Sequence, residues 1–251
     1  MIVFEHVTKE YPTKLALEDL NLQIEDGEIF GLIGHNGAGK TTAIKALTGI
    51  HEPTSGRVLV GGHDVAKEGM TTKAMIGYVP DSPDMFLQLS AREYWDLIAS
   101  IYGVRDQIKE ERLLELLQTF PLERTDEAIA NYSHGMRQRV FLIGALLPNP
   151  SVWVLDEPMT GLDPEASYRL KEMMRTHAKE GNTVLFSTHV LEVAETLCDR
   201  IAILQRGHLI FLGTMEELKA QHPGEGLERI YLKLIGSLDE SGGGDSHDES
   251  L

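Results

Sequence analysis

The stretch "GLIGHNGAGKTT", residues 31–42, decides the fold. Residues 34–41 match the pattern G-x-x-x-x-G-K-[ST], whose glycines let the backbone point its N–H groups at a phosphate. In this pattern the lysine, here Lys40, reaches the β and γ phosphates, and the hydroxyl of Thr41 can ligate Mg²⁺. We therefore predict a nucleotide-binding loop rather than a chance glycine turn. Its candidate residues are Gly34, His35, Asn36, Gly37, Ala38, Gly39, Lys40, Thr41 and Thr42.

Around this loop, short apolar or alternating runs between turn residues predict strands. These runs cover residues 1–8, 16–24, 27–34, 56–62, 74–80, 152–158, 183–189, 200–207 and 208–213. Helical patterns cover residues 40–49, 164–179 and 190–198, and a last short helix starts at Thr214. Strands that alternate with helices predict an α/β fold with a mainly parallel core sheet. The N-terminal strands are expected to be antiparallel.

A predicted helical insert interrupts this alternation over residues 82–148. Helical spacing runs through residues 90–118, and Ser90 with Glu93 has the spacing of a capping box. The expected apolar face consists of Trp95, Ile98, Leu113, Leu116 and Leu117.

The amino-acid composition limits the classes of function that this chain can have. The net charge of −16 argues against a nucleic-acid partner, because phosphate neutralisation needs clustered Lys and Arg. Residues 237–251 hold five acids and no Lys or Arg, so they read as a disordered acidic tail. The single cysteine excludes an intrachain disulfide and fits a reducing compartment. The longest apolar run, "VFLIGALL", falls short of the roughly 20 residues that span a bilayer. If the protein works at a membrane, we expect another subunit to supply the membrane-spanning segments.

Two polar groups follow buried strands. In "VWVLDEP", Asp156 is placed to hold Mg²⁺ and Glu157 to orient and deprotonate an attacking water. At the end of "TVLFSTH", His189 is placed to bond a γ-phosphate and that water. The alternatives are a solvated turn with a helix-capping acid for the pair, and a capping or packing role for the histidine.

A second phosphate-directed segment is "NYSHGMRQRV", residues 131–140. Ser133 stands at the head of an apolar helix, with its hydroxyl and nearby N–H groups expected to be free. Such a helix end attracts anions by roughly 0.3–1 kcal/mol. The alternative is an ordinary capped core helix.

In this order and spacing, "GHNGAGKTT", "YSHGMRQRV", "VLDEP", "GLDP" and "STH" resemble the ATP-binding cassette of ABC transporters. The resemblance covers residues 1–220, followed by a C-terminal extension over 221–236 and then the tail. It implies ATP and Mg²⁺ as ligands, and two cassettes that dimerise head to tail around two ATP. The signature residues that would grip the neighbour's ATP are Ser133, His134, Gly135 and Met136.

The same resemblance places Tyr11 where an aromatic ring stacks on adenine. It places Asp163 at the dimer seam, although Asp163 before Pro164 is also a good helix N-cap. Two departures stand out: Met136 replaces the usual glutamine of the signature, and Asp81 stands where the family usually has the glutamine that touches Mg²⁺ and water. Metal ligation is therefore expected from Thr41, Asp81 and Asp156.

The signature pattern S-x-G-M-x-Q resembles bacterial exporter cassettes of drug, peptide, antibiotic-resistance and Ecs-type systems. This implies a separate transmembrane permease and a position on the cytoplasmic face of the membrane. Met85, Phe86 and Leu87 are candidate permease contacts, or else they pack inside the insert. Two other functions stay open: a soluble ABC-type ATPase acting on ribosomes or DNA, and an ATP-sensing regulatory module.

Overall fold

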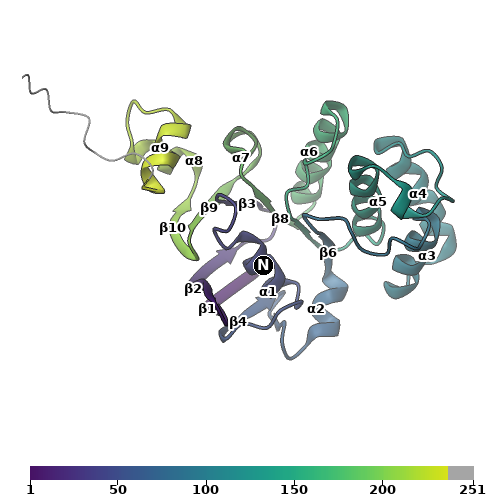
Figure 1. Ribbon diagram of the computed structural model, residues 1–251, viewed down its shortest axis with the longest axis horizontal. Coiled ribbons are helices and arrows are strands. Elements are labelled where there is room, and N and C mark those ends of the chain that lie inside the picture. The colour runs from purple at the N-terminus through teal and green to yellow at the C-terminus, as the bar shows by residue number, and fades with distance from the viewer. Residues whose placement is uncertain (237–251) are drawn as a thin grey trace, which may run out of the picture.

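The computed structural model describes residues 1–236, which form two sheets surrounded by helices (Figure 1). An antiparallel sheet has the strand order β2-β1-β4-β5, and a six-stranded sheet has the order β10-β9-β3-β8-β7-β6. The first sheet contains β1 (Ile2–Tyr11), β2 (Lys14–Ile24), β4 (Ser55–Val60) and β5 (His63–Asp64). The second, the core sheet, contains β3 (Ile29–Ile33), β6 (Ile76–Val79), β7 (Val152–Leu155), β8 (Thr183–Thr188), β9 (Arg200–Gln205) and β10 (His208–Gly213).

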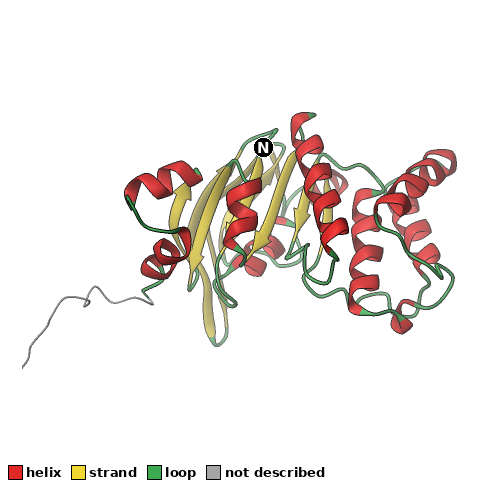
Figure 2. Cartoon of the chain, turned by 90° about the horizontal axis from the view of Figure 1, so that it is seen from above, coloured by secondary structure: helices red, strands yellow, loops and turns green. Residues whose placement is uncertain are grey.

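Helices lie beside the strands, and those of the insert form a separate group at one end (Figure 2). The helices are α1 (Lys40–Leu47), α2 (Gly69–Met75), α3 (Ala91–Ile101), α4 (Asp106–Thr119), α5 (His134–Leu146), α6 (Pro164–Lys179), α7 (Leu191–Leu197), α8 (Met215–Gln221) and α9 (Leu227–Leu234). A short 3₁₀ helix spans Ile129–Asn131.

The core sheet is parallel except at one edge. Strand β3 pairs in parallel with β8 and β9, and β7 pairs in parallel with β6 and β8, whereas β10 runs antiparallel to β9. Every residue of β3, β7 and β8 is buried. Continuous burial is typical of parallel strands that are covered on both faces. The predicted α/β fold, with a mainly parallel core and antiparallel N-terminal strands, is confirmed.

The insert consists of separate helices rather than one long one. The helical spacing of residues 90–118 is divided between α3 and α4, because Gly103 takes a φ of +66° in the turn between them. The capping box of Ser90 and Glu93 is present. Trp95 is fully buried, and its indole N–H donates to the Val140 carbonyl of α5 at 3.0 Å. Figure 1 shows these insert helices at one end of the molecule and α8 with α9 at the other.

Helix α2 and the short strand β5 had no counterpart in the sequence prediction. Helix α2 has seven residues, of which Thr72 alone is buried, so it carries almost no apolar periodicity. Strand β5 has two residues, which is too short for an alternating pattern.

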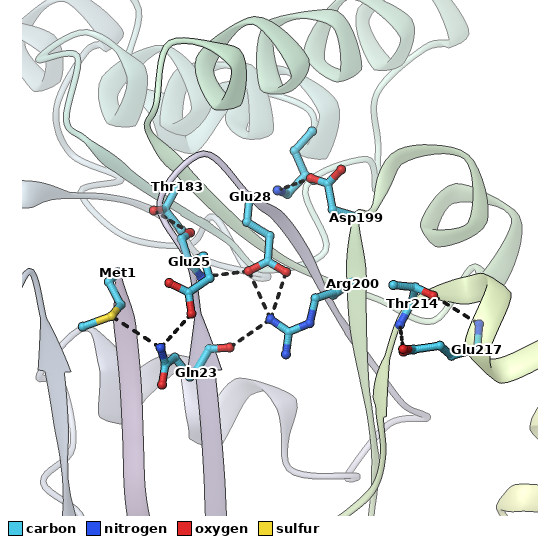
Figure 3. A network of polar contacts seen from close by, with 10 residues as sticks. Met1, Gln23, Glu25, Glu28, Thr183, Asp199, Arg200, Thr214 and Glu217 are labelled. Carbon is cyan, nitrogen blue, oxygen red and sulfur yellow. Dashed lines mark hydrogen bonds and ion pairs between the residues drawn. The ribbon is translucent and has the colours of Figure 1, made fainter.

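A polar network around the buried Glu28 lies at the amino ends of the core strands (Figure 3). The Glu28 carboxylate accepts the backbone N–H of Glu25 at 2.8 Å and the guanidinium of Arg200 at 3.2 Å. Asp199 accepts the N–H of Ile29, the first residue of β3, at 2.8 Å. These contacts fix the start of the strand whose other end leads into the phosphate loop.

The predicted acidic tail, residues 237–251, lies outside the described residues. The proposed domain limits, 1–220 with an insert over 82–148, remain predictions. Within residues 1–236, none of the helices has both the length and the apolar character that crossing a membrane requires.

Candidate functional site

The phosphate loop leaves β3 and ends in α1. Gly39 is the N-cap of α1 and has a φ of +118°, a conformation that side chains oppose. A Cβ at this position would also lie 2.9 Å from the carbonyl oxygen of Ala16. No side chain caps α1, so the N–H groups of its first turn are left for a ligand. The backbone therefore has the form that a phosphate-binding loop needs.

Lys40 is buried, with 6% of its side chain exposed. Its ammonium donates to the carbonyl oxygen of Gly34 at 2.5 Å and lies 3.4 Å from Oε1 of Glu157. A second cation, Lys14, donates to the Gly37 carbonyl oxygen at 3.1 Å. Lys14 and Lys40 both line a pocket of about 90 Å³ over the loop. Sequence reasoning missed Lys14, because a lysine at the start of a strand carries no signal of its own.

Asp156 follows β7 and is fully buried. Its Oδ1 accepts the Ser187 hydroxyl at 2.5 Å, whereas its Oδ2 has no hydrogen-bond partner among the described residues. Burial raises the pKa of this carboxyl, and the negative charge of Asp81 adds to the rise. The hydroxyls of Ser187 and Thr41 and the charge of Lys40 oppose it. Asp156 thus lies near Thr41 and Asp81, the other predicted metal ligands, and its Oδ2 has no other partner among the described residues.

Glu157 has a φ of +48°, which is uncommon for a residue with a side chain. Its N–H donates to Oγ of Ser187 at 3.0 Å, so one serine holds both acidic residues. Its Oε2 lies 3.0 Å from Nδ1 of His189. Strained backbone of this kind is concentrated at functional sites. Ser187 was not among the predicted site residues, although it is a polar residue next to the end of a buried strand.

The donor set fits Mg²⁺. The ion prefers oxygen ligands and is usually held by one or two carboxylates together with substrate phosphates. The unpartnered Oδ2 of Asp156, the nearby Thr41 hydroxyl and the exposed carboxylate of Asp81 match that pattern. Among residues 1–236 no group of three or more His, Cys, Asp or Glu side chains is placed to hold a metal by itself.

Tyr11 lies at the end of β1. Its hydroxyl is 2.8 Å from Nδ1 of His51, and the Lys9 ammonium lies 5.2 Å from the ring centroid. Nothing in these contacts tests whether the ring stacks on adenine.

The signature segment forms the start of α5. The Ser133 hydroxyl accepts the Met136 N–H at 3.3 Å, so it caps the helix and is not wholly free as predicted. Ser133 and His134 are exposed, whereas Met136 packs partly against the insert core. A Cβ on Gly135 would lie 2.4 Å from the Gly161 carbonyl oxygen. The glycine is therefore needed for contact with the chain's own loop, whatever else approaches it.

Asp163 is the N-cap of α6, as the alternative interpretation expected. Its Oδ1 accepts the N–H of Ala166 at 2.9 Å, and its Oδ2 forms an ion pair with Arg139 of α5. This pair, unforeseen from the sequence, connects α6 to the signature helix.

Among the candidate permease contacts, Met85 and Phe86 are 45% and 46% exposed, while Leu87 packs against the insert core. The same segment is tied to α5, because the Asp84 carboxylate accepts from Arg137 at 2.7 Å.

One chain thus brings together only half of the predicted site. Lys40, Thr41, Asp156, Glu157 and His189 converge at the carboxyl edge of the core sheet. In the described part of the chain, no hydrogen bond or ion pair joins residues 131–140 to residues 34–42.

An α/β core with this phosphate loop, buried lysine and carboxylate pair defines an ATP-binding cassette with ATPase machinery. The family model described as "ABC transporter" matches residues 17–160. The chain belongs to the ABC transporter family and is an ATP-binding subunit of it.

Individual relatives agree with this assignment. The ABC-type transporter ATP-binding protein EcsA of Bacillus subtilis (strain 168) is 34% identical over 93% of this chain and 96% of its own. The Nod factor export ATP-binding protein I of Burkholderia thailandensis is 36% identical over 92% of this chain and 76% of its own. A dimeric structure of the cassette MJ0796, bound to ADP and Pi after hydrolysis, has a TM-score of 0.78 at 25% identity. It covers 86% of this chain and 99% of that one.

Proposed function

We propose that this chain is the ATP-hydrolysing subunit of an exporter whose membrane-spanning part is a separate chain. The exporter assignment rests on the signature pattern and on the export function in the name of a relative. The cassette would occupy residues 1–220, with the insert over 82–148 and an extension over 221–236. Binding to the permease would hold it at the cytoplasmic face of the membrane.

The phosphate loop would wrap the β and γ phosphates with the N–H groups of residues 37–42. Lys40 would leave Glu157 for the phosphates, because a γ-phosphate carries more negative charge than one carboxylate. Tyr11, anchored through its hydroxyl by His51, would stack its ring on adenine.

The convergence of Lys40, Asp156, Glu157 and His189 carries the proposed hydrolysis. Glu157 accepts a proton from water as the water oxygen bonds to the γ-phosphorus. The bond from that phosphorus to the β–γ bridging oxygen breaks, and ADP keeps the electron pair. His189 forms a hydrogen bond with Oε2 of Glu157. It would also form a hydrogen bond with the γ-phosphate. A base of this kind is worth about 10²–10⁴ in rate.

Thr41, Asp156 and Asp81 would hold Mg²⁺. Bound there, the ion neutralises the negative charge of the phosphate oxygens. Asp81 is one methylene shorter than the glutamine that usually occupies its place, and it is anionic.

Ser133, His134, Gly135 and Met136 would grip the ATP held by a second copy. Support comes from the separation of this segment from the phosphate loop within one chain, and from the dimeric neighbour MJ0796. Asp163 would lie at the seam, where its ion pair with Arg139 links it to the signature helix.

Met85, Phe86 and Leu87 are proposed to contact the permease. The exposure of the first two side chains supports this. We propose no nucleic-acid partner, in line with the net charge of −16.

The decisive experiment is the Glu157→Gln variant, which keeps the shape of the side chain and removes the base. We expect phosphate release to fall by about 10²–10⁴, and light scattering with MgATP to show a trapped dimer. The exposed Glu180 of the α6 C-terminus gives a matched control, Glu180→Gln, which should behave as wild type. Normal hydrolysis by Glu157→Gln without a trapped dimer contradicts the proposal.

Asp81 favours one second candidate, an ATP-sensing module without useful turnover. Steady-state phosphate release by the wild-type chain, with and without its permease, distinguishes the two. Turnover that rises with the permease supports the transporter subunit, and negligible release in both states supports the sensor.

A further inference from the structure

Helix α9 contributes to the apolar cluster that also contains the last residue of β3, the strand that leads into the phosphate loop. Ile230 is fully buried in the same apolar cluster as Ile33, the last residue of β3. Leu227, Tyr231 and Leu234 pack against this cluster from the same helix. The spacing of these four residues is that of one amphipathic face. The helix lies in the C-terminal extension, outside the residues 17–160 that match the family model.

The turn between β9 and β10 joins α9 to the loop. The side-chain amide of Gln205 donates to the carbonyl oxygen of Ile235, directly after α9. Two residues later, the Gly207 N–H donates to the carbonyl oxygen of Ala38, inside the phosphate loop, at 2.8 Å. Arg206 and Gly207 both have positive φ, +49° and +88°, as in the tight two-residue turns of hairpins. A short and stiff connection therefore runs from α9 to the loop.

Tyr231 makes a second connection. Burial raises the pKa of its hydroxyl, and a contact with the backbone N–H of His35, the second residue of the phosphate loop, opposes that rise. The His35 side chain is engaged elsewhere, because its Nδ1 lies 2.7 Å from the Asn36 carbonyl oxygen. The Tyr231 ring itself packs against the apolar cluster that contains Ile33, the residue directly before the loop.

We propose that residues 227–235, the C-terminal brace, position the phosphate loop for nucleotide through Tyr231 and Gln205. The inference rests on the proposed role of the loop in binding ATP. A loop whose N–H groups are already held in place loses less conformational entropy when it binds a phosphate. Since coupling is reciprocal, a bound nucleotide must also stabilise the brace.

The variants Tyr231→Phe and Gln205→Ala test the brace in the full-length protein. Each removes one polar contact and leaves the apolar face of α9 intact. A hydrogen bond's usual worth predicts a rise of roughly three- to tenfold in KM for MgATP and in Kd for MgADP. The kcat should stay within a factor of about two, because the reacting groups are untouched.

Tyr102→Phe is the matched control. Tyr102 is also partly buried, and its hydroxyl donates to a backbone carbonyl, that of Ile76, at 2.6 Å. It lies at the end of α3 in the insert. This variant should lose stability without a change in KM or Kd.

Hydrogen exchange distinguishes the brace from a purely structural helix, because only the brace should exchange more slowly when nucleotide binds. The amides of residues 227–235 should exchange several-fold more slowly in wild-type protein with saturating MgADP, and less so in Tyr231→Phe. Unchanged Kd in both variants, together with exchange that ignores MgADP, overturns the brace even if the variants melt earlier. The Lys40→Ala variant tests the proposed function separately from the brace. Normal MgADP binding by this variant refutes the proposed function. If the variant loses MgADP binding, the brace is judged by the results for Tyr231→Phe and Gln205→Ala.

Discussion

Two buried carboxylates lie at opposite edges of the core sheet and differ in how they are paired. Glu28, at the amino edge, accepts a backbone N–H and faces the Arg200 guanidinium. Asp156, at the carboxyl edge, is more deeply buried, and its Oδ2 has no partner among the described residues. Burial raises the pKa of both carboxyls.

The difference separates a structural carboxylate from a functional one. A buried charge that is fully paired within the fold needs nothing further, whereas an unpaired oxygen beside a phosphate loop is left for a ligand. Burial or a shifted pKa alone would not distinguish Glu28 from Asp156. The substitutions below test whether the pairing of each carboxylate distinguishes the functional residue from the structural one.

The largest expected effect is that of Asp156→Asn. We expect ATP hydrolysis to fall by on the order of a hundredfold or more, because the carboxylate that would hold the metal is lost. The free energy of unfolding without nucleotide should stay constant or rise, since the substitution removes a buried charge that has one oxygen without a partner. Phosphate release and urea unfolding measure the two. A large loss of stability would show that Asp156 is structural. The exposed Asp106 provides the control Asp106→Asn.

Arg200→Met should have the opposite profile. The substitution leaves the buried Glu28 carboxylate without its partly exposed cation, and losing the partner of a buried polar group costs about 1–3 kcal/mol of unfolding free energy. We expect MgATP hydrolysis to be nearly unchanged well below the unfolding temperature. Adding Glu28→Gln to Arg200→Met should restore part of the stability, and failure of this rescue would assign the loss to packing instead.

His177 supplies a buried titratable group that should stay uncharged. Its ring stacks on Trp153 at 3.9 Å between centroids, and burial lowers its pKa to about 4. The unfolded chain takes up this proton below pH about 6.5, so the stabilisation is complete above that pH and is lost as the pH falls towards 4. The expected loss is about 2 kcal/mol at pH 5. Urea unfolding of wild type and His177→Phe at pH 7 and pH 5 measures it: the variant should lose correspondingly less, and an equal loss in both refutes the assignment.

The smallest effect is expected for Ser187→Ala. Its hydroxyl contacts both Asp156 and the Glu157 N–H, so the variant loosens both without removing either. A loss of about 1 kcal/mol corresponds to roughly a fivefold lower kcat. Because Ser187 acts by positioning, KM for MgATP should hold. Ser100→Ala, on the exposed side of α3, serves as control.

The sequence predicted what is local. Residues 34–41 and 152–157 each carry their chemistry within one contiguous run, and the mainly parallel core followed from the alternation of strands with helices. The contacts of Ser187, Lys14 and His51 were not predictable, because each joins strands or loops far apart in the chain. Helix α9 was left within an unassigned extension, since its apolar face has a meaning only beside Ile33.

A further miss shows the limit of periodicity. The spacing of residues 90–118 continues in phase across Gly103, so the break between α3 and α4 leaves little trace in the apolar pattern. The predicted site residues are where the loop and strand ends place them.

The contact between Gly135 and Gly161 has a practical consequence. Two backbones that meet where not even one methyl group fits must shift together, so a fluorescent label beside Gly161 should respond to events at the signature helix. Directed evolution faces a firm limit here: a side chain at position 135 would meet a backbone oxygen that no substitution removes, so libraries should keep Gly135 fixed.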